Sequence, residues 1–152
     1  MLQRIQTVYL LLVGALFIAL LFMPLAIITA DQIYRFDVTG LNTVMPEAQL
    51  IFPTWGLFAL TAIIALLAVV TIFLYKKRVL QIRLTIFNTL LMVGFYALVF
   101  YYVYNVKADM EGTALNVKFA LSFPLIAIIL NYLAIRNIGA DEALVRSLNR
   151  LR

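Results

Sequence analysis

Four long stretches of apolar residues dominate the pattern of the chain. They cover residues 5–28, 54–75, 84–104 and about 115–135, and Lys118 is the only charged side chain within them. A helix needs about 20 mostly apolar residues to cross the hydrocarbon core of a bilayer. Because each stretch reaches that length, the pattern predicts an all-α membrane protein, a bundle of four transmembrane helices in one domain.

The first stretch also has an alternative interpretation as a secretory signal peptide. The sequence around Ala30 offers a small-residue cleavage site. The apolar run is, however, longer than the 7–15 residues that are usual for a signal peptide. We therefore interpret it as an uncleaved first helix.

The two connections that follow the first and third stretches contain alternating patterns. In the segment 33–41, Tyr34, Phe36 and Val38 alternate with polar residues before a glycine, and the segment 114–119 alternates in the same way. Alternation with a period of two is typical of a half-buried strand. The pattern predicts a small β element built from both connections and covering one end of the bundle; the alternative is irregular loops lying against lipid headgroups.

The end of the chain, residues 137–152, has a third kind of pattern. After the sequence NIG, Asp141 and Glu142 occupy what would be a first helical turn, where acidic side chains favour the helix dipole. One face then carries the apolar residues Leu144, Val145, Leu148 and Leu151, and the other carries Arg146 and Arg150. This predicts a separate short amphipathic helix, which would bind either the membrane surface or a partner protein.

Composition supports the membrane assignment and excludes several kinds of chemistry. The chain is 65% hydrophobic and 12% charged, whereas soluble domains are about half apolar and a quarter charged. It contains no Cys and no His. Disulfides, thiol catalysis and zinc sites of the Cys/His type are therefore excluded, and we expect no metal and no cofactor.

The charges are distributed unequally between the two sides of the predicted bundle. Nine of the twelve basic residues lie on the side of the two termini, namely Arg4, Lys76, Lys77, Arg78, Arg83, Arg136, Arg146, Arg150 and Arg152. Five of the seven acidic residues lie on the other side, namely Asp31, Asp37, Glu47, Asp109 and Glu111. Since Lys and Arg are enriched in cytoplasmic segments, we expect both termini to be cytoplasmic. This topology accounts for the net charge of +5, so we expect no nucleic acid partner.

Three positions within the apolar stretches are candidates for a polar site inside the membrane. Asn88 and Asn131 are the strongest candidates for a small polar cavity, although such side chains more often join neighbouring helices. Tyr96 lies deeper than the tyrosines at the end of the third stretch and needs a hydrogen-bond partner or a wet cavity. An aromatic site for a lipid or quinone is a minor alternative for Tyr96.

The two ends of the chain carry a resemblance. MLQRIQTVYLLL at the start and DEALVRSLNRLR at the end resemble a family of small uncharacterised four-helix inner-membrane proteins of Bacteroidota bacteria, a domain of unknown function. The resemblance implies an integral protein of the bacterial inner membrane with both ends cytoplasmic, and it supplies no activity. It directs attention to a candidate interaction surface formed by Gln3, Arg4, Gln6, Asp141, Glu142, Arg146 and Arg150.

These observations leave three hypotheses for function. The leading one is a non-enzymatic scaffold or accessory subunit whose cytoplasmic termini bind a membrane-protein partner, a second copy, or anionic lipid of the inner leaflet. The alternative is a carrier or binder of a lipid or small apolar ligand within the bundle. An enzyme is the third, because the five acidic residues of the outer connections are the only concentration of catalytic side-chain types. We expect no catalytic activity.

Overall fold

The protein consists of four helices and a small antiparallel sheet. The computed structural model describes residues 2–44, 50–109 and 114–150, and side chains over 5–44, 50–108 and 114–148. The helices are α1 (Leu2–Leu20), α2 (Trp55–Phe73), α3 (Arg78–Asp109) and α4 (Phe123–Arg150). The remaining elements are β1 (Ala26–Thr29), β2 (Ile33–Phe36), β3 (Gly40–Thr43), β4 (Leu50–Pro53), β5 (Ala114–Val117) and the 3-10 helix η1 (Phe119–Ser122).

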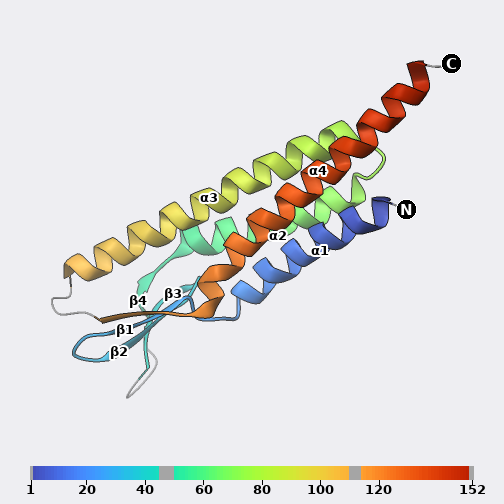
Figure 1. Ribbon diagram of the computed structural model, residues 1–152. Helices are drawn as coiled ribbons and strands as arrows, with labels where there is room; N and C mark the ends of the chain where they lie inside the picture. The colour runs from blue at the N-terminus through green and yellow to red at the C-terminus, as the bar shows by residue number, and fades with distance from the viewer. Residues whose placement is uncertain (1, 45–49, 110–113, 151–152) are drawn as a thin grey trace.

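The helices lie side by side, with both ends of the chain at one end of the bundle and the sheet at the other (Figure 1). We call these two ends the terminal end and the sheet end. The closely packed pairs are α1 with α2, α2 with α3, α3 with α4, and α4 with α1. The helices therefore form a ring in sequence order, and each is antiparallel to the next.

Buried positions on each helix recur in alternating steps of three and four residues. On α1 they are Gln6, Leu10, Val13, Phe17 and Leu20. On α3 they are Gln81, Thr85, Asn88, Met92, Phe95 and Val99, and on α4 they include Ala127, Asn131, Ala134 and Ile138. An average step of about 3.5 residues is the repeat of helices that pack with a slight left-handed coil. The heptad spacing thus directs one stripe of each helix into the bundle.

The outward surface of the bundle is apolar. Leu66 on α2, Leu90 on α3 and Ile129 on α4 are 63%, 66% and 53% exposed. Helices α2, α3 and α4 are long and apolar enough to cross a membrane, while the apolar part of α1, Ile5–Leu20, is shorter. An apolar surface that surrounds a bundle is what lipid contact requires and what water penalises. The structure is compatible with a membrane protein.

The predicted first helix over 5–28 is wrong in its second half. Helix α1 ends at Leu20, and Ala26–Thr29 forms strand β1. Leu25, Ala26 and Ile28 are apolar because they are buried where the sheet meets the bundle, and the backbone N–H of Leu25 donates to the carbonyl of Phe36 at 2.9 Å. Apolar residues buried in protein and apolar residues facing lipid have the same hydropathy, so the pattern alone predicts one span here.

The predicted β element is present and is larger than predicted. Five antiparallel strands are arranged in the order β4-β3-β2-β1-β5, so residues from both connections pair in one sheet. Ile28 of β1 lies opposite Tyr34 on one side and Leu115 on the other. Phe36 and Val38 are buried and Arg35 is exposed, which confirms the alternation in this segment. The segment 33–41 was predicted as one strand ending at a glycine turn, whereas β2 ends at Phe36 and Gly40 begins β3. Strands β1, β3 and β4 were not predicted.

The sheet is joined to the bundle at the start of α2. The hydroxyl of Thr54, which is fully buried, donates to the carbonyl of Val38 at 2.8 Å. Gly40 packs so closely on the neighbouring strand that a Cβ atom there would lie 2.8 Å from the backbone oxygen of Phe52. Only glycine allows this approach, because a backbone atom held in the sheet cannot move away.

Helices α3 and α4 differ from their predicted spans. The third span was predicted over 84–104, whereas α3 runs from Arg78 to Asp109. The prediction for 115–135 is wrong at its start, because 114–117 is strand β5 and α4 begins at Phe123.

The prediction of a separate tail helix is also wrong, since α4 continues without a break through Gly139 to Arg150. Ile138 is fully buried and continues the stripe of Asn131 and Ala134, so the same face of the helix stays packed beyond residue 136. A single helical glycine costs only about 1 kcal/mol relative to alanine, which this packing outweighs.

Candidate functional site

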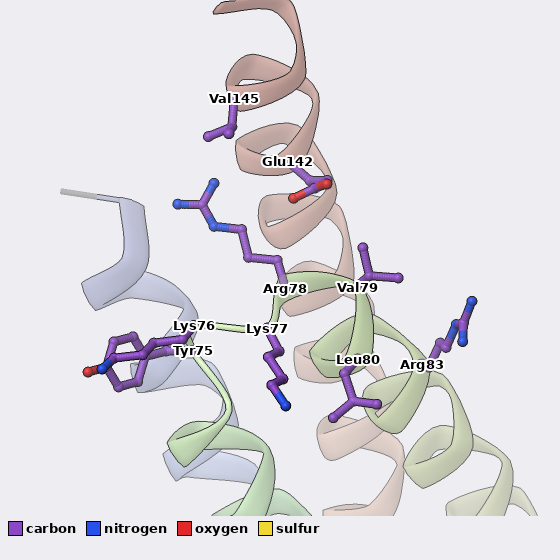
Figure 2. A pocket seen from close by; sticks show the side chains of 9 residues that line it. All are labelled: Tyr75, Lys76, Lys77, Arg78, Val79, Leu80, Arg83, Glu142 and Val145. Carbon is purple, nitrogen blue, oxygen red and sulfur yellow. The ribbon is translucent and has the colours of Figure 1, made fainter. Parts of the chain in front are cut away.

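An open cleft lies at the terminal end between the α2–α3 turn and α4. Residues 75–80, Arg83 of α3, and Glu142 and Val145 of α4 line it, and its volume is about 710 Å³. We call it the basic cleft, because Lys76, Lys77, Arg78 and Arg83 contribute four cationic groups. Figure 2 shows these side chains around the opening, with Arg78 extending beside α4 and Lys77 pointing in the opposite direction.

The positive charge of the basic cleft is not neutralised within the described chain. The ion pairs among residues with described side chains join Arg35 to Asp37 and Arg146 to Glu142, at 2.9 and 3.1 Å. Glu142, the acidic residue of the cleft, is therefore already paired. Lys76 lies 5.9 Å from the ring centroid of Tyr75, and Arg78 donates to the backbone carbonyl of Asp141 at 3.3 Å. The cleft is a region of positive potential.

A smaller cleft lies next to the basic cleft, between α3 and α4. It is lined by Val79, Ile82 and Arg83 of α3 and by four residues of α4, and its volume is about 390 Å³. Gly139, Glu142, Ala143 and Arg146 are those four. The two clefts share Val79, Arg83 and Glu142, so cationic groups surround both sides of this contact.

The predicted interaction surface is brought together only in part. The amide of Gln6 donates to the carboxylate of Asp141 at 3.2 Å, which ties the first turns of α1 to α4. These two residues therefore hold the bundle together at this end, and only Glu142 and Arg146 stand at the clefts. Gln3 and Arg4 lie in α1 and Arg150 in α4, but their side chains are outside the described part of the chain.

The last turns of α4 extend beyond the other helices (Figure 1). All residues from 143 to 148 are exposed, including Leu144, Val145 and Leu148 at 56%, 38% and 66%. The hydrogen bonds from Gln6 and Arg78 to Asp141 fix α4 just before this projecting end. An apolar helix face is thus held away from the bundle; Leu151, predicted to extend that face, lies outside the described residues.

The polar positions inside the bundle have unequal hydrogen bonding. Asn131 is fully buried, and its amide nitrogen donates to the hydroxyl of Thr89 at 3.2 Å, which joins α4 to α3. The side-chain oxygens of Asn88 and Asn131 are both buried without a hydrogen-bond partner. The Tyr96 hydroxyl donates to the backbone carbonyl of Leu121 at 2.8 Å, so it joins α3 to η1. Each asparagine keeps an acceptor that a water or a ligand could use.

The acidic residues of the outer connections do not form a described carboxylate site. Asp37 accepts a hydrogen bond from Arg35, while Glu47, Glu111 and the side chain of Asp109 lie outside the described residues. Among the residues that the structure describes, no three acidic side chains lie close enough together to hold a metal ion.

The sequence of residues 76–83 favours a topology signal, with contact to anionic headgroups as the alternative, and it does not predict a cleft. Their charge is visible in the sequence, but the cleft depends on the unbroken course of α4, which brings Glu142 and Val145 beside the α2–α3 turn. The continuous heptad stripe through Ile138 is the signal that could have revealed it.

Comparison with known proteins adds a family and no activity. No curated protein matches the chain. Residues 2–151 match the family described as Domain of unknown function (DUF4293), in agreement with the resemblance seen at the two ends. Because the match covers nearly the whole chain, the protein belongs to the DUF4293 family.

Proposed function

We propose that the protein is a non-enzymatic membrane scaffold or accessory subunit that binds a partner protein through the projecting end of α4. The observation that carries this proposal is the exposed apolar face of Leu144, Val145 and Leu148 on a continuous helix. An amphipathic helix that presents residues at i and i+4 to an apolar groove is a common mode of protein recognition. Burying two leucines supplies a substantial part of the binding free energy, at about 1.5–3 kcal/mol for each side chain.

The course of α4 favours a protein partner over the membrane surface. A helix that lies on a bilayer needs a bend at the membrane boundary so that its apolar face can turn into the lipid. Helix α4 has no break at Gly139 and continues in the direction of the bundle (Figure 1). In a bilayer that surrounds the bundle, its last turns therefore extend away from the lipid.

The proposed location is the inner membrane of a bacterium, with four membrane-crossing helices and both termini in the cytoplasm. The distribution of Lys and Arg supports this orientation. Helix α1 completes the set of four, since Val8 and Leu11 are 53% and 57% exposed like the outward residues of its neighbours. Because the chain contains no Cys, single cysteines can test the orientation. The variants are Ser147→Cys at the terminal end and Gln32→Cys at the sheet end. In intact cells, a maleimide that does not cross the membrane should label only Gln32→Cys.

A carrier of an apolar ligand within the bundle has weaker support. Phe17, Met92 and Phe95 fill the interior and are fully buried. The two clefts at the terminal end are open rather than internal, and a third cavity of about 210 Å³ beside Thr39, Trp55 and Phe58 adjoins the sheet. These three cavities lie toward the two ends of the bundle. We also propose that the chain has no catalytic activity of its own.

The test is quantitative co-purification of the full-length protein from native membranes. Leu144→Gln/Leu148→Gln removes the apolar face and keeps good helix formers, whereas Ala143→Gln/Ser147→Gln changes two exposed residues on another face of the same turns. We expect a stoichiometric protein partner with the wild type and the Ala143/Ser147 control, and a loss of at least about tenfold with the leucine variant.

Equal recovery of the partner with all three proteins would refute the proposal, as would recovery of lipid alone with each of them. If the mass of the complex shows a second copy of this chain in place of another protein, the scaffold proposal is replaced by self-association through α4.

A further inference from the structure

The basic cleft has the charge that a phosphate group requires. Its four cations come from the α2–α3 turn and the first two turns of α3, and its carboxylate is paired with Arg146. Guanidinium and ammonium groups form strong, charge-assisted hydrogen bonds with phosphate oxygens. The positive end of the helix dipole of α3 lies at the same place and adds to the potential that the four side chains create.

The cleft also has an apolar side. Val79 and Leu80 line it and are 42% and 40% exposed, and Val145 lines it from α4. Just before the turn, Phe73 is 76% exposed on the outward surface of α2. A ligand that fits both parts of this surface carries an anionic head and apolar chains.

The residues of the turn follow the order of layers in a bilayer leaflet. Phe73 is apolar, Tyr75 is amphipathic, and Lys76, Lys77 and Arg78 are cationic. Aromatic residues such as tyrosine are enriched at the membrane boundary, and basic residues next to a membrane helix interact with anionic headgroups. With α2 in the bilayer, the cleft lies at the level of the lipid phosphates.

We propose that the basic cleft binds the headgroup phosphate of an anionic phospholipid, with the acyl chains against Val79, Leu80 and the outward surface of α2. Lys77 contacts the phosphate from the α2–α3 turn, and Arg78 lies at the side of α4, where the carbonyl of Asp141 accepts a hydrogen bond from it. Lys76 and Arg83, which point to the two outer sides of the cleft (Figure 2), add to the positive potential. A phosphorylated soluble protein would use the cations but not the apolar side, so the lipid accounts for more of the surface.

This inference is independent of the partner proposed for α4. The lipid site uses the α2–α3 turn and the start of α3. The docking face shares Val145 with the cleft, but Leu144 and Leu148, which the leucine variant changes, do not line it. Loss of one interaction therefore leaves the other measurable.

The experiment is native mass spectrometry of the full-length protein in mild detergent, titrated with phosphatidylglycerol, with phosphatidylcholine and with inorganic phosphate. The variant is Lys76→Gln/Lys77→Gln, and the matched control is Lys107→Gln/Lys118→Gln, which removes the same charge from two exposed positions at the sheet end. Circular dichroism and size-exclusion chromatography establish that each variant is folded.

We expect saturable binding of phosphatidylglycerol to the wild type and the control, and binding weaker by about tenfold or more in the Lys76/Lys77 variant. Phosphatidylcholine should bind weakly to all three proteins. Equal affinity of variant and control for phosphatidylglycerol overturns the proposal.

Two further outcomes also overturn it. If inorganic phosphate displaces phosphatidylglycerol at equal concentration, the cleft is a site for the free anion and not for the lipid. The second outcome is a partner protein that binds the wild type and not the Lys76/Lys77 variant in the co-purification described above. If the lipid affinity of that variant is unchanged, the cations serve protein recognition.

Discussion

The half of the bundle next to the sheet and the half next to the termini have different interiors. At the sheet end, Phe17, Leu57, Phe95 and Val99 occupy the buried positions, and Phe17 and Phe95 meet edge to face with ring centroids 5.9 Å apart. At the terminal end, several of the buried positions are occupied by polar residues, namely Gln6, Thr71, Gln81, Thr85 and Asn88, beside the apolar Leu10, Ala134 and Ile138.

In the polar half, some buried side chains form hydrogen bonds within their own helix, and one buried oxygen has no partner. The hydroxyls of Thr71 and Thr85 donate to the carbonyls of Leu67 and Gln81 one turn earlier on their own helices, which satisfies a hydroxyl without joining two helices. The side-chain oxygen of Asn88 has no partner. The apolar half is therefore held by packing and capped by the sheet. The polar half combines the packing of Ile138 with the hydrogen bond from Gln6 to Asp141, and it adjoins the basic cleft. These buried polar groups and the basic cleft therefore lie at the same end of the bundle.

The largest expected effect is on the apolar half. Phe17→Ala removes a fully buried ring and its contact with Phe95, so we expect the free energy of unfolding to fall by about 3–5 kcal/mol. The control is Ile18→Ala, at a position that is 47% exposed, with an expected change within about 0.5 kcal/mol. Unfolding in dodecyl sulfate mixed micelles, followed by far-ultraviolet circular dichroism, measures both. Similar losses for the two variants would contradict the packed core described for this half.

The next effect tests whether the sheet stabilises the bundle. In Gly40→Ala the new Cβ would meet the backbone oxygen of Phe52, so we expect a loss of about 1–3 kcal/mol in the same unfolding measurement. Gly94→Ala is the matched control, because nothing lies within 4 Å of a Cβ at that position of α3. A Gly40→Ala protein as stable as the control would contradict the close approach of β3 and β4 described at Gly40.

The smallest effects separate the two asparagines of the interior. Asn131→Leu removes the hydrogen bond to Thr89, and such bonds between membrane helices contribute about 0.6 kcal/mol on average. Asn88→Leu removes an oxygen that has no partner, so we expect equal or greater stability. Chemical unfolding of the two variants in parallel measures the change in the free energy of unfolding, which we expect to be a loss for Asn131→Leu and no loss for Asn88→Leu. A loss of stability in Asn88→Leu would reveal a water or ligand bound to that oxygen.

Much of the architecture could be predicted from the sequence, because it depends on local composition. The apolar stretches predict four helices, and the alternation around Phe36 predicts strands that pair across two connections. The candidate site could be predicted only in part. Asp141 was assigned to an interaction surface, but its side chain accepts the amide of Gln6 and its carbonyl accepts Arg78. Which polar groups find a partner depends on which helices are neighbours, and hydropathy does not encode that.

The sequence by itself determined the kind of surface that each helix carries. Apolar residues around the whole circumference require either lipid or protein on every side, and the heptad stripe selects the face that packs inward. The tertiary structure alone decided where the apolar residues after Leu20 are buried and how far α4 extends. A strand at Ala26–Thr29 is stable only because β2 and β5 lie on both sides of it. In the same way, α4 continues through Gly139 because Ile138 is buried, and that contact with the bundle outweighs the local preference of glycine to end a helix.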